Sequence, residues 1–330
     1  MTPGVLVAVD VGGSSSRAVA VRDDGTTIAS VVAPGAAKTG AAIEAAVLGV
    51  VRTVLGDVRA AAGGGGAVAS IAVGATGMSS LAAEHGRFAA RLVEVSGTTR
   101  VALAADALTA HLGALGDGPG AVLAVGTGSV ALGRTDDGHW YRADGWGHLL
   151  GDDGGAAWLG AQGLRRALAE HDGRAVDGAA VDGGTGAGAD GATLLAAGRD
   201  LLGDPSGWPR AVHGRDDPAT LFASFAPAVT ALAAAGDRAA TELVDRAGRA
   251  LAATASAVLR DGVPPVLSGV GGVLDVPTVS TAFRRHLATA RPEVRLVDPA
   301  GDPLAGAVAL ARALAAGDPP VEAVSGLLWT

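Results

Sequence analysis

Residues 5–22 read VLVAVDVGGSSSRAVAVR, and this stretch decides the fold. A valine-rich run bounded by turn residues is typical of a buried strand, and a second apolar run returns after the glycines and serines. The pattern therefore predicts a strand, a tight polar turn and a second strand. Gly12 and Gly13 let the turn backbone approach an anion closely. Ser14 and Ser15 add hydroxyl and amide donors to the same turn.

Two interpretations fit this turn. In the first, the turn holds a phosphate, and Asp10, at the end of the first strand, coordinates the metal ion bound to that phosphate. In the second, the turn is an ordinary hairpin that Asp10 merely caps, because glycine-rich turns are common.

A second copy of the pattern favours the phosphate interpretation. Residues 120–134 read GAVLAVGTGSVALGR, which is again a strand, a polar turn over 126–129 and a strand. Asp136, Asp137 and Gly138 then close a hairpin, as residues 23–25 do after the first copy. Two phosphate-type turns on two similar halves predict a duplicated domain with a nucleotide between the halves.

Composition narrows the function classes. A chain of 330 residues predicts two domains, and its net charge of -8 disfavours nucleic acid as a partner, because binding phosphates of DNA or RNA needs clustered cations. Because the chain has no cysteine, it cannot use disulfides, thiolate metal ligands or cysteine-bound iron–sulfur clusters. The sequence contains neither a long uninterrupted apolar segment nor a signal peptide pattern, so we expect no membrane partner and a cytoplasmic protein. A Walker A loop is excluded because Ala37, not glycine, precedes Lys38.

Asp106 stands where a predicted strand passes into a predicted helix. It follows the apolar run 101–105 and begins a helical pattern, where an aspartate is also a routine helix cap. The strand predicted over 70–77 ends in a Gly/Thr turn, and residues 76–80 are expected to border the site, because open α/β sheets bind ligands at the carboxyl ends of their strands. The Gly- and Pro-rich break over 116–120 marks a domain boundary.

Three later segments complete the set of motifs. Residues 145–154 read GWGHLLGDDG, residues 265–274 predict a strand, a glycine turn and a helix start, and Pro303 stands in the first turn of a last helix. Helices are also expected over 40–62, 154–171, 192–202, 217–234 and 237–260, a surface loop over 172–191 and a connector over 204–216.

In this order the motifs resemble the N-acetylglucosamine kinase branch of the BadF/BadG/BcrA/BcrD ATPases, within the actin and hexokinase superfamily. The resemblance covers nearly the whole chain. It implies an α/β fold of two actin-like (ribonuclease H-like) domains with a nucleotide cleft between them. The expected domains are 1–115 plus about 303–330, and 116–302.

The resemblance also implies ATP and Mg²⁺ as cofactors, an amino sugar as the substrate and a homodimer as the assembly. Asp10 would hold the metal and Asp106 would be the catalytic base. The implied ATP contacts are Gly12, Gly13, Ser14, Ser15, Thr127, Gly128 and, at the adenosine, Gly269, Gly271 and Gly272. The implied sugar contacts are Asp106, Ser129, Gly145, Trp146 and Asp152.

Two departures from the family leave the acceptor open. A sugar-contacting asparagine of the family has no counterpart in residues 34–39, and Val130 stands where the family often has asparagine. N-acetylglucosamine, glucosamine and another hexose all stay possible acceptors. The alternative function is a nucleotide- or sugar-binding sensor, or an ATPase of the same fold, with little sugar kinase turnover.

Overall fold

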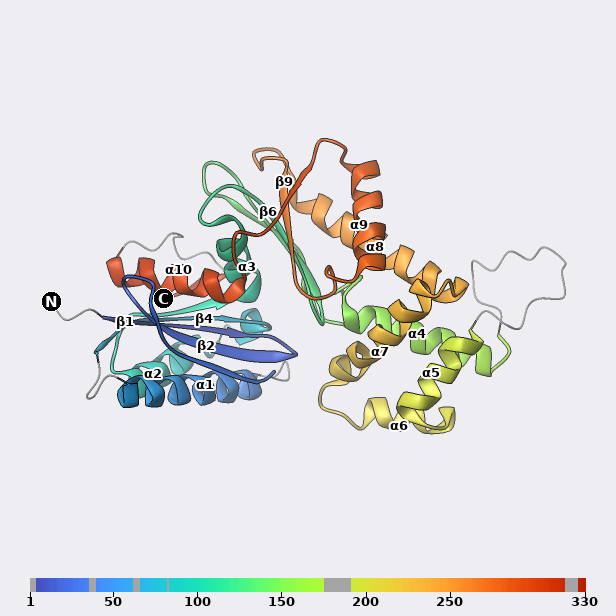
Figure 1. Ribbon diagram of the computed structural model, residues 1–330, viewed down its shortest axis with the longest axis horizontal. Helices are drawn as coiled ribbons and strands as arrows, with labels where there is room; N and C mark the ends of the chain where they lie inside the picture. The colour runs from blue at the N-terminus through green and yellow to red at the C-terminus, as the bar shows by residue number, and fades with distance from the viewer. Residues whose placement is uncertain (1–3, 36–39, 62–65, 82, 175–190, 318–325) are drawn as a thin grey trace.

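The computed structural model contains two β-sheets, each covered by helices, that lie side by side with α3 (Asp106–Leu115) between them (Figure 1). It describes residues 4–35, 40–61, 66–81, 83–174, 191–317 and 326–330. The expectations for residues 36–39, which include Lys38, and for most of the 172–191 loop lie outside the described residues. The predicted α/β class with two actin-like units is confirmed, since each unit has its own mixed sheet.

The first sheet has six strands in the order β11-β5-β4-β1-β2-β3. Their bounds are Val5–Val11 for β1, Ser15–Arg22 for β2, Thr27–Pro34 for β3, Val68–Ala75 for β4, Val101–Ala105 for β5 and Leu328–Trp329 for β11. β1 is antiparallel to β2 and parallel to β4. The strand–turn–strand predicted from the opening stretch is therefore present, and β1 lies inside the sheet.

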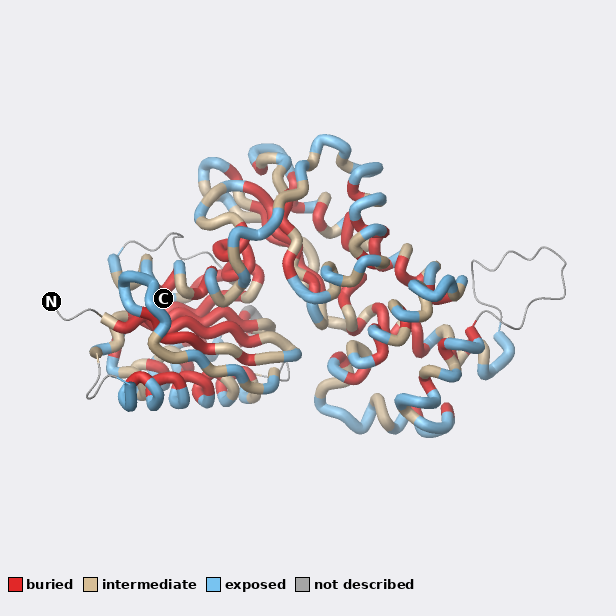
Figure 2. Tube along the Cα trace, in the orientation of Figure 1, coloured by how far each residue is buried: buried red, intermediate tan, exposed pale blue. Residues whose placement is uncertain are grey.

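Both faces of the first sheet are covered, which explains the continuous apolar run of β1. Val7 and Val9 pack with buried residues of α1 (Gly40–Ala61) and α2 (His85–Ser96). Leu6 and Ala8, pointing to the other face, pack with α3 and α10 (Pro303–Ala316). Figure 2 shows the resulting buried layer in the middle of this sheet.

The second sheet has five strands in the order β10-β9-β6-β7-β8. Their bounds are Gly120–Val125 for β6, Ser129–Arg134 for β7, Trp140–Asp144 for β8, Val266–Val270 for β9 and Arg295–Val297 for β10. The helices of this part are α4 (Ala156–His171), α5 (Ala192–Leu202), α6 (Trp208–His213), α7 (Pro218–Ala234), α8 (Arg238–Val258) and α9 (Pro277–Ala290). The repeated strand–turn–strand pattern is confirmed as β6 and β7, which pair antiparallel.

The chain returns to the first sheet at its end. After β10 it crosses to α10, which packs against α3, β1 and β4, and β11 then pairs antiparallel with β5 (Figure 1). α10 approaches α3 so closely that a Cβ on Gly306 would lie 1.9 Å from the carbonyl oxygen of Thr109. Glycine at this position therefore permits the contact between the two helices.

Most expected helices are confirmed, and two segments differ. The connector expected over 204–216 contains a short 3₁₀ helix (Pro205–Gly207) and α6, because its two prolines begin these helices instead of interrupting them. The helix expected to follow the glycine turn at 269–272 begins only at Pro277. No single described helix is long and apolar enough to cross a membrane; α7 and α8 meet that test only together, as a pair bent by 113°.

Candidate functional site

A cleft of about 540 Å³ lies where the two polar turns face each other. The turn after β1 contributes Gly12, Gly13 and Ser14, and the turn after β6 contributes the segment 126–129. The two turns are in contact, since a Cβ on Gly13 would lie 2.9 Å from the Oγ1 of Thr127. The sequence-predicted phosphate turns thus form one site, although Ser15 begins β2 and is not among the lining residues.

Each turn is closed by its own backbone. The Gly12 amide donates to the Ser15 carbonyl at 2.9 Å, and the Gly126 amide donates to the Gly128 carbonyl at 2.9 Å. Such tight glycine turns present backbone amides to an anion. Gly128 cannot be exchanged for a larger residue, because its Cβ would lie 2.2 Å from the Asp152 carboxylate.

Asp106 lies at the wall of this cleft, at the first residue of α3. Its Oδ1 accepts a hydrogen bond from the Ala107 amide at 2.9 Å. It is also near enough to Asp10 for its charge to help raise the pKa of Asp10. The two candidate carboxylates therefore belong to one region, as the sequence interpretation requires.

Asp10 is buried and paired with Arg17, which stands opposite it in the β1–β2 register. Arg17 donates from Nη2 at 2.7 Å and from Nε at 3.2 Å, both to Oδ2 of Asp10. The pKa of Asp10 is nevertheless raised, because its burial outweighs the bonds and charge of Arg17. Arg17 also donates to the Asp302 carboxylate at 2.6 Å.

The residues around Asp10 fit a magnesium ion only with ligands from outside the chain. Among the described residues there is no group of three or more acidic or histidine side chains that could hold a metal. Both Arg17 bonds reach Oδ2, and Oδ1 of Asp10 accepts none from the described residues. A hard cation that keeps waters and binds phosphate oxygens could use that single carboxylate oxygen.

The predicted sugar contacts Ser129, Gly145, Trp146 and Asp152 all line the same cleft. Asp144, which the sequence interpretation did not single out, holds them together. Its Oδ1 accepts from the Asp152 amide at 2.7 Å, and its Oδ2 accepts from the Asp153 amide at 3.1 Å and from the Ser129 hydroxyl at 3.4 Å. Its position directly before the glycine of residues 145–154 is the only sequence signal for this role.

Burial is the main cause that raises the pKa of Asp153, and the nearby Asp144 and Asp152 raise it further. The carboxylates of Asp144, Asp152 and Asp153 therefore lie close together, and Asp152 lines the cleft. Arg142 is the basic residue nearest to these aspartates in the sequence, and it lines the same cleft. The sequence interpretation also did not identify Arg142, Arg17 or Asp302 as site residues. Of their contacts, only the pairing of Arg17 with Asp10 could have been expected, because the register of a tight hairpin places the two residues opposite each other.

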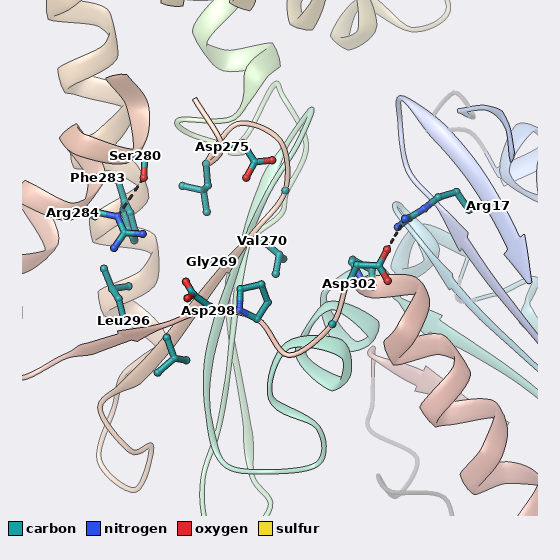
Figure 3. A pocket seen from close by; sticks show the side chains of 16 residues that line it. Arg17, Gly269, Val270, Asp275, Ser280, Phe283, Arg284, Leu296, Asp298 and Asp302 are labelled. Carbon is teal, nitrogen blue, oxygen red and sulfur yellow. Dashed lines mark hydrogen bonds and ion pairs between the residues drawn. The ribbon is translucent and has the colours of Figure 1, made fainter. Parts of the chain in front are cut away.

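A second pocket, of about 610 Å³, lies beside the cleft and is lined by Gly269 and Gly271 (Figure 3). Gly271 has φ +102°, and a Cβ there would lie 2.3 Å from the Val125 carbonyl oxygen, so this turn requires glycine. Arg17 and Asp302 form the edge of the pocket, and their ion pair is drawn in Figure 3. Gly272, the third glycine predicted for adenosine, is not among the lining residues.

Two sheets that each send a glycine-rich turn into one cleft define a two-lobed α/β protein of the actin and hexokinase type. The chain belongs to the BadF/BadG/BcrA/BcrD ATPase family, whose model matches residues 7–311.

Known proteins resemble the chain over most of its length. The solved structure of a protein assigned as an N-acetylglucosamine kinase, from Chromobacterium violaceum, has a TM-score of 0.71 and 30% identity, covering 93% of this chain and 99% of that one. A ROK family glucokinase from Streptomyces griseus, solved with glucose and AMPPNP, shares the fold with a TM-score of 0.54 and 20% identity, covering 93% of this chain and 97% of that one.

A curated relative is the N-acetylmuramic acid/N-acetylglucosamine kinase of Clostridium acetobutylicum. It is 26% identical over 212 residues, which are 63% of this chain and 65% of the relative. The match thus spans slightly less than two thirds of that relative's length.

Proposed function

We propose that this protein is an ATP- and Mg²⁺-dependent amino-sugar kinase that phosphorylates the 6-hydroxyl of N-acetylglucosamine or glucosamine. One observation carries the proposal: a carboxylate at a helix start, Asp106, shares one cleft with both glycine-rich turns and with the residues expected to bind sugar. Family membership and the kinases that resemble the chain support the same activity.

Phosphoryl transfer needs positioned phosphates and a base near the attacking hydroxyl more than it needs covalent chemistry. The backbone of Gly12 and Gly13 and the Ser14 hydroxyl would hold the phosphates from one side, and Thr127 and Gly128 from the other. Gly269 and Gly271 would leave room for the adenosine in the adjoining pocket. Asp10 would hold Mg²⁺, which offsets phosphate charge when bound.

In the reaction, the sugar O6 forms a bond to the γ-phosphorus while the bond from that phosphorus to the bridging oxygen of ADP breaks. Asp106 accepts the proton that O6 loses. Ser129, Gly145, Trp146 and Asp152 orient the sugar, since hydroxyl, backbone and carboxylate groups bond ring hydroxyls and an indole covers an apolar ring face. Closure of the lobes would exclude water as a competing acceptor.

The proposal includes the division into domains 1–115 plus about 303–330, and 116–302. α10 and β11 are part of the layers of the first sheet, which supports the inclusion of the chain end in the first domain. The homodimer and the cytoplasmic location expected from the sequence stay predictions.

The test is acceptor-dependent release of ADP from ATP, measured over N-acetylglucosamine, glucosamine, N-acetylmuramic acid, N-acetylmannosamine and glucose. We expect an amino sugar to be the best acceptor. Sugar-independent ATP hydrolysis would point to an ATPase, and sugar or nucleotide binding without turnover would point to a sensor.

Asp106→Asn tests the proposed base. The change should lower kcat by about 10²- to 10⁴-fold, the usual contribution of a general base, while sugar affinity measured by calorimetry stays near normal. Asp117→Asn, an exposed aspartate at the other end of α3, is the matched control. Near-normal turnover of Asp106→Asn would remove Asp106 from the mechanism.

A further inference from the structure

Arg142 is the only cation among the described residues that line the central cleft. It lies on β8, and its guanidinium is 5.0 Å from the centre of the Trp146 ring, a stacking distance. The wall around it contains Gly145, Trp146 and Asp152, the residues proposed to contact sugar. Arg142 therefore belongs to the acceptor side of the site.

The bonds of Arg142 hold its orientation without neutralising its charge. Nε donates to the Asp144 carbonyl at 3.1 Å, and Nη2 donates to the Gly145 carbonyl at 2.6 Å. No carboxylate in the described part of the chain forms an ion pair with it. Arg17, by contrast, pairs with two carboxylates, and Glu44 pairs with two arginines. The guanidinium thus retains charge and N–H donors, chiefly on Nη1, for a ligand.

Sheet order separates Arg142 from the adenosine pocket. β8 is one edge of the second sheet and β10 is the other, with β9 next to β10; the pocket is bordered by β9 and β10. With strands about 4.8 Å apart, the three steps from β9 to β8 correspond to roughly 14 Å. A group on the acceptor is therefore a better partner for Arg142 than the nucleoside part of ATP.

We propose that Arg142 binds a carboxylate on the acceptor, so that the site takes an acidic amino sugar as well as N-acetylglucosamine and prefers the acid to a neutral derivative of the same size. This inference rests on the proposed sugar kinase function and names the chemical class of its acceptor. A planar guanidinium that is already oriented can bind a carboxylate through two parallel hydrogen bonds, and it loses little side-chain entropy in doing so. Arg142 would be a specificity residue, and Asp106 would stay the base.

The experiment compares three acceptors that differ in charge and size. N-acetylglucosamine is neutral, N-acetylmuramic acid carries a carboxylate on an ether substituent, and its methyl ester has nearly the same size without the charge. For the unchanged protein we expect kcat/KM for the acid to exceed that for the ester by about 10- to 100-fold, the range for a charge-assisted hydrogen-bonded pair.

Arg142→Met should bring the ratio of acid to ester close to one, and Arg142→Lys should retain part of the preference. Arg142 also fixes the Gly145 backbone, so the methionine variant is expected to act more slowly on every acceptor. The ratio within each variant cancels that general loss, as in a double-mutant cycle. Arg260→Met is the matched control, because Arg260 is exposed and stacks on Tyr141 of the same strand.

Calorimetric binding of the acid and the ester separates this inference from the kinase proposal. Acid-selective binding that depends on Arg142, without phosphorylation of any acceptor, would support the carboxylate site and overturn the kinase activity. Phosphorylation of acid and ester at equal kcat/KM, or an unchanged ratio in Arg142→Met, would overturn the inference and leave the kinase in place. An equal loss of kcat on all three acceptors at an unchanged ratio would assign Arg142 to the transferred phosphate.

Discussion

Asp144 and Asp152 are the two described residues other than glycine with positive φ, at +62° and +60°. Aspartate tolerates this backbone region better than most residues, yet such a conformation persists only where its surroundings hold it. Here the Asp144 carboxylate stabilises both backbone conformations, because it accepts hydrogen bonds from the backbone amides of Asp152 and Asp153. The partly buried side chain of Asp144 thereby sets the shape of the proposed sugar site.

Asp144→Asn should test that role, because asparagine keeps the size and the tolerance of positive φ. Its amide group would place N–H donors against one of the two backbone amides. We expect KM for the sugar to rise about 10-fold, consistent with the loss of a charge-assisted hydrogen bond, and kcat to fall less. Steady-state kinetics over a sugar series would measure both. Asp137→Asn is the control, because Asp137 is exposed in the turn between β7 and β8. An unchanged KM in Asp144→Asn would mean that other contacts position the sugar site.

At the scale of elements, α10 links the chain end to the nucleotide side of the site. Its cap residue Asp302 accepts the Ala305 amide at 2.9 Å and also pairs with Arg17, which in turn pairs with Asp10. The start of α10 and the proposed metal ligand are therefore joined by one arginine. A change at the helix cap should reach the metal site.

Asp302→Asn and Asp302→Ala separate the cap from the ion pair. Asparagine retains a cap oxygen, so it should lose only the half-exposed ion pair, which is expected to contribute less than about 1 kcal/mol. Alanine should lose about 1 kcal/mol more, the typical contribution of a cap. Urea unfolding would measure both losses.

The dependence of rate on Mg²⁺ concentration gives a second measurement, because both variants free Arg17 from Asp302. Both should therefore change the half-saturating Mg²⁺ concentration. Asp237→Ala removes a cap at α8, where Asp237 accepts the Ala240 amide at 2.8 Å, and serves as the control. Equal Mg²⁺ dependence in all three variants would argue against the link from α10 to Asp10.

Elements with a strong local pattern could be predicted from the sequence, and elements that depend on distant partners could not. The runs 5–22 and 120–134 each predict a strand, a turn and a strand, because valine-rich segments flank glycine turns. α2 has only a few buried positions, among them Phe88 and Leu92, and was not predicted. β11 has two residues and exists through its pairing with β5, which no local pattern indicates.

The same division holds for the site. Asp106, Gly128 and Trp146 lie in motifs whose resemblance to the family implies a place in the candidate site, and all three line the cleft. The pair of Arg17 with Asp302 joins residues 285 positions apart, so it depends on the crossing of the chain into α10. The hydrogen bonds of Arg142 to two uncharged backbone carbonyls likewise depend on the path of the backbone at the end of β8.

At the scale of the whole molecule, α3 is the joint between the two sheets. It follows β5 of the first sheet and contacts β6, β7 and β9 of the second (Figure 1). His111 of α3 is fully buried in this joint, where its Nε2 bonds the Gly118 carbonyl at 3.0 Å and its ring meets Trp140 edge-on at 4.8 Å. Burial is the main cause that lowers the pKa of His111 to about 4, and the charge of Arg134 lowers it further.

This histidine should make the fold sensitive to mild acid. A histidine pKa near 4 in the folded state and about 6.5 in the unfolded state means that the unfolded chain binds the extra proton first. Stability from this group is complete above pH 6.5 and should fall by about 2–3 kcal/mol as the pH drops toward 4. Urea unfolding at pH 7, 6, 5 and 4.5 would measure the loss, which His111→Gln should reduce because glutamine does not titrate. His213→Gln, at an exposed position, should follow the unchanged protein. Parallel curves for all three would mean that the joint between the sheets does not sense protons through His111.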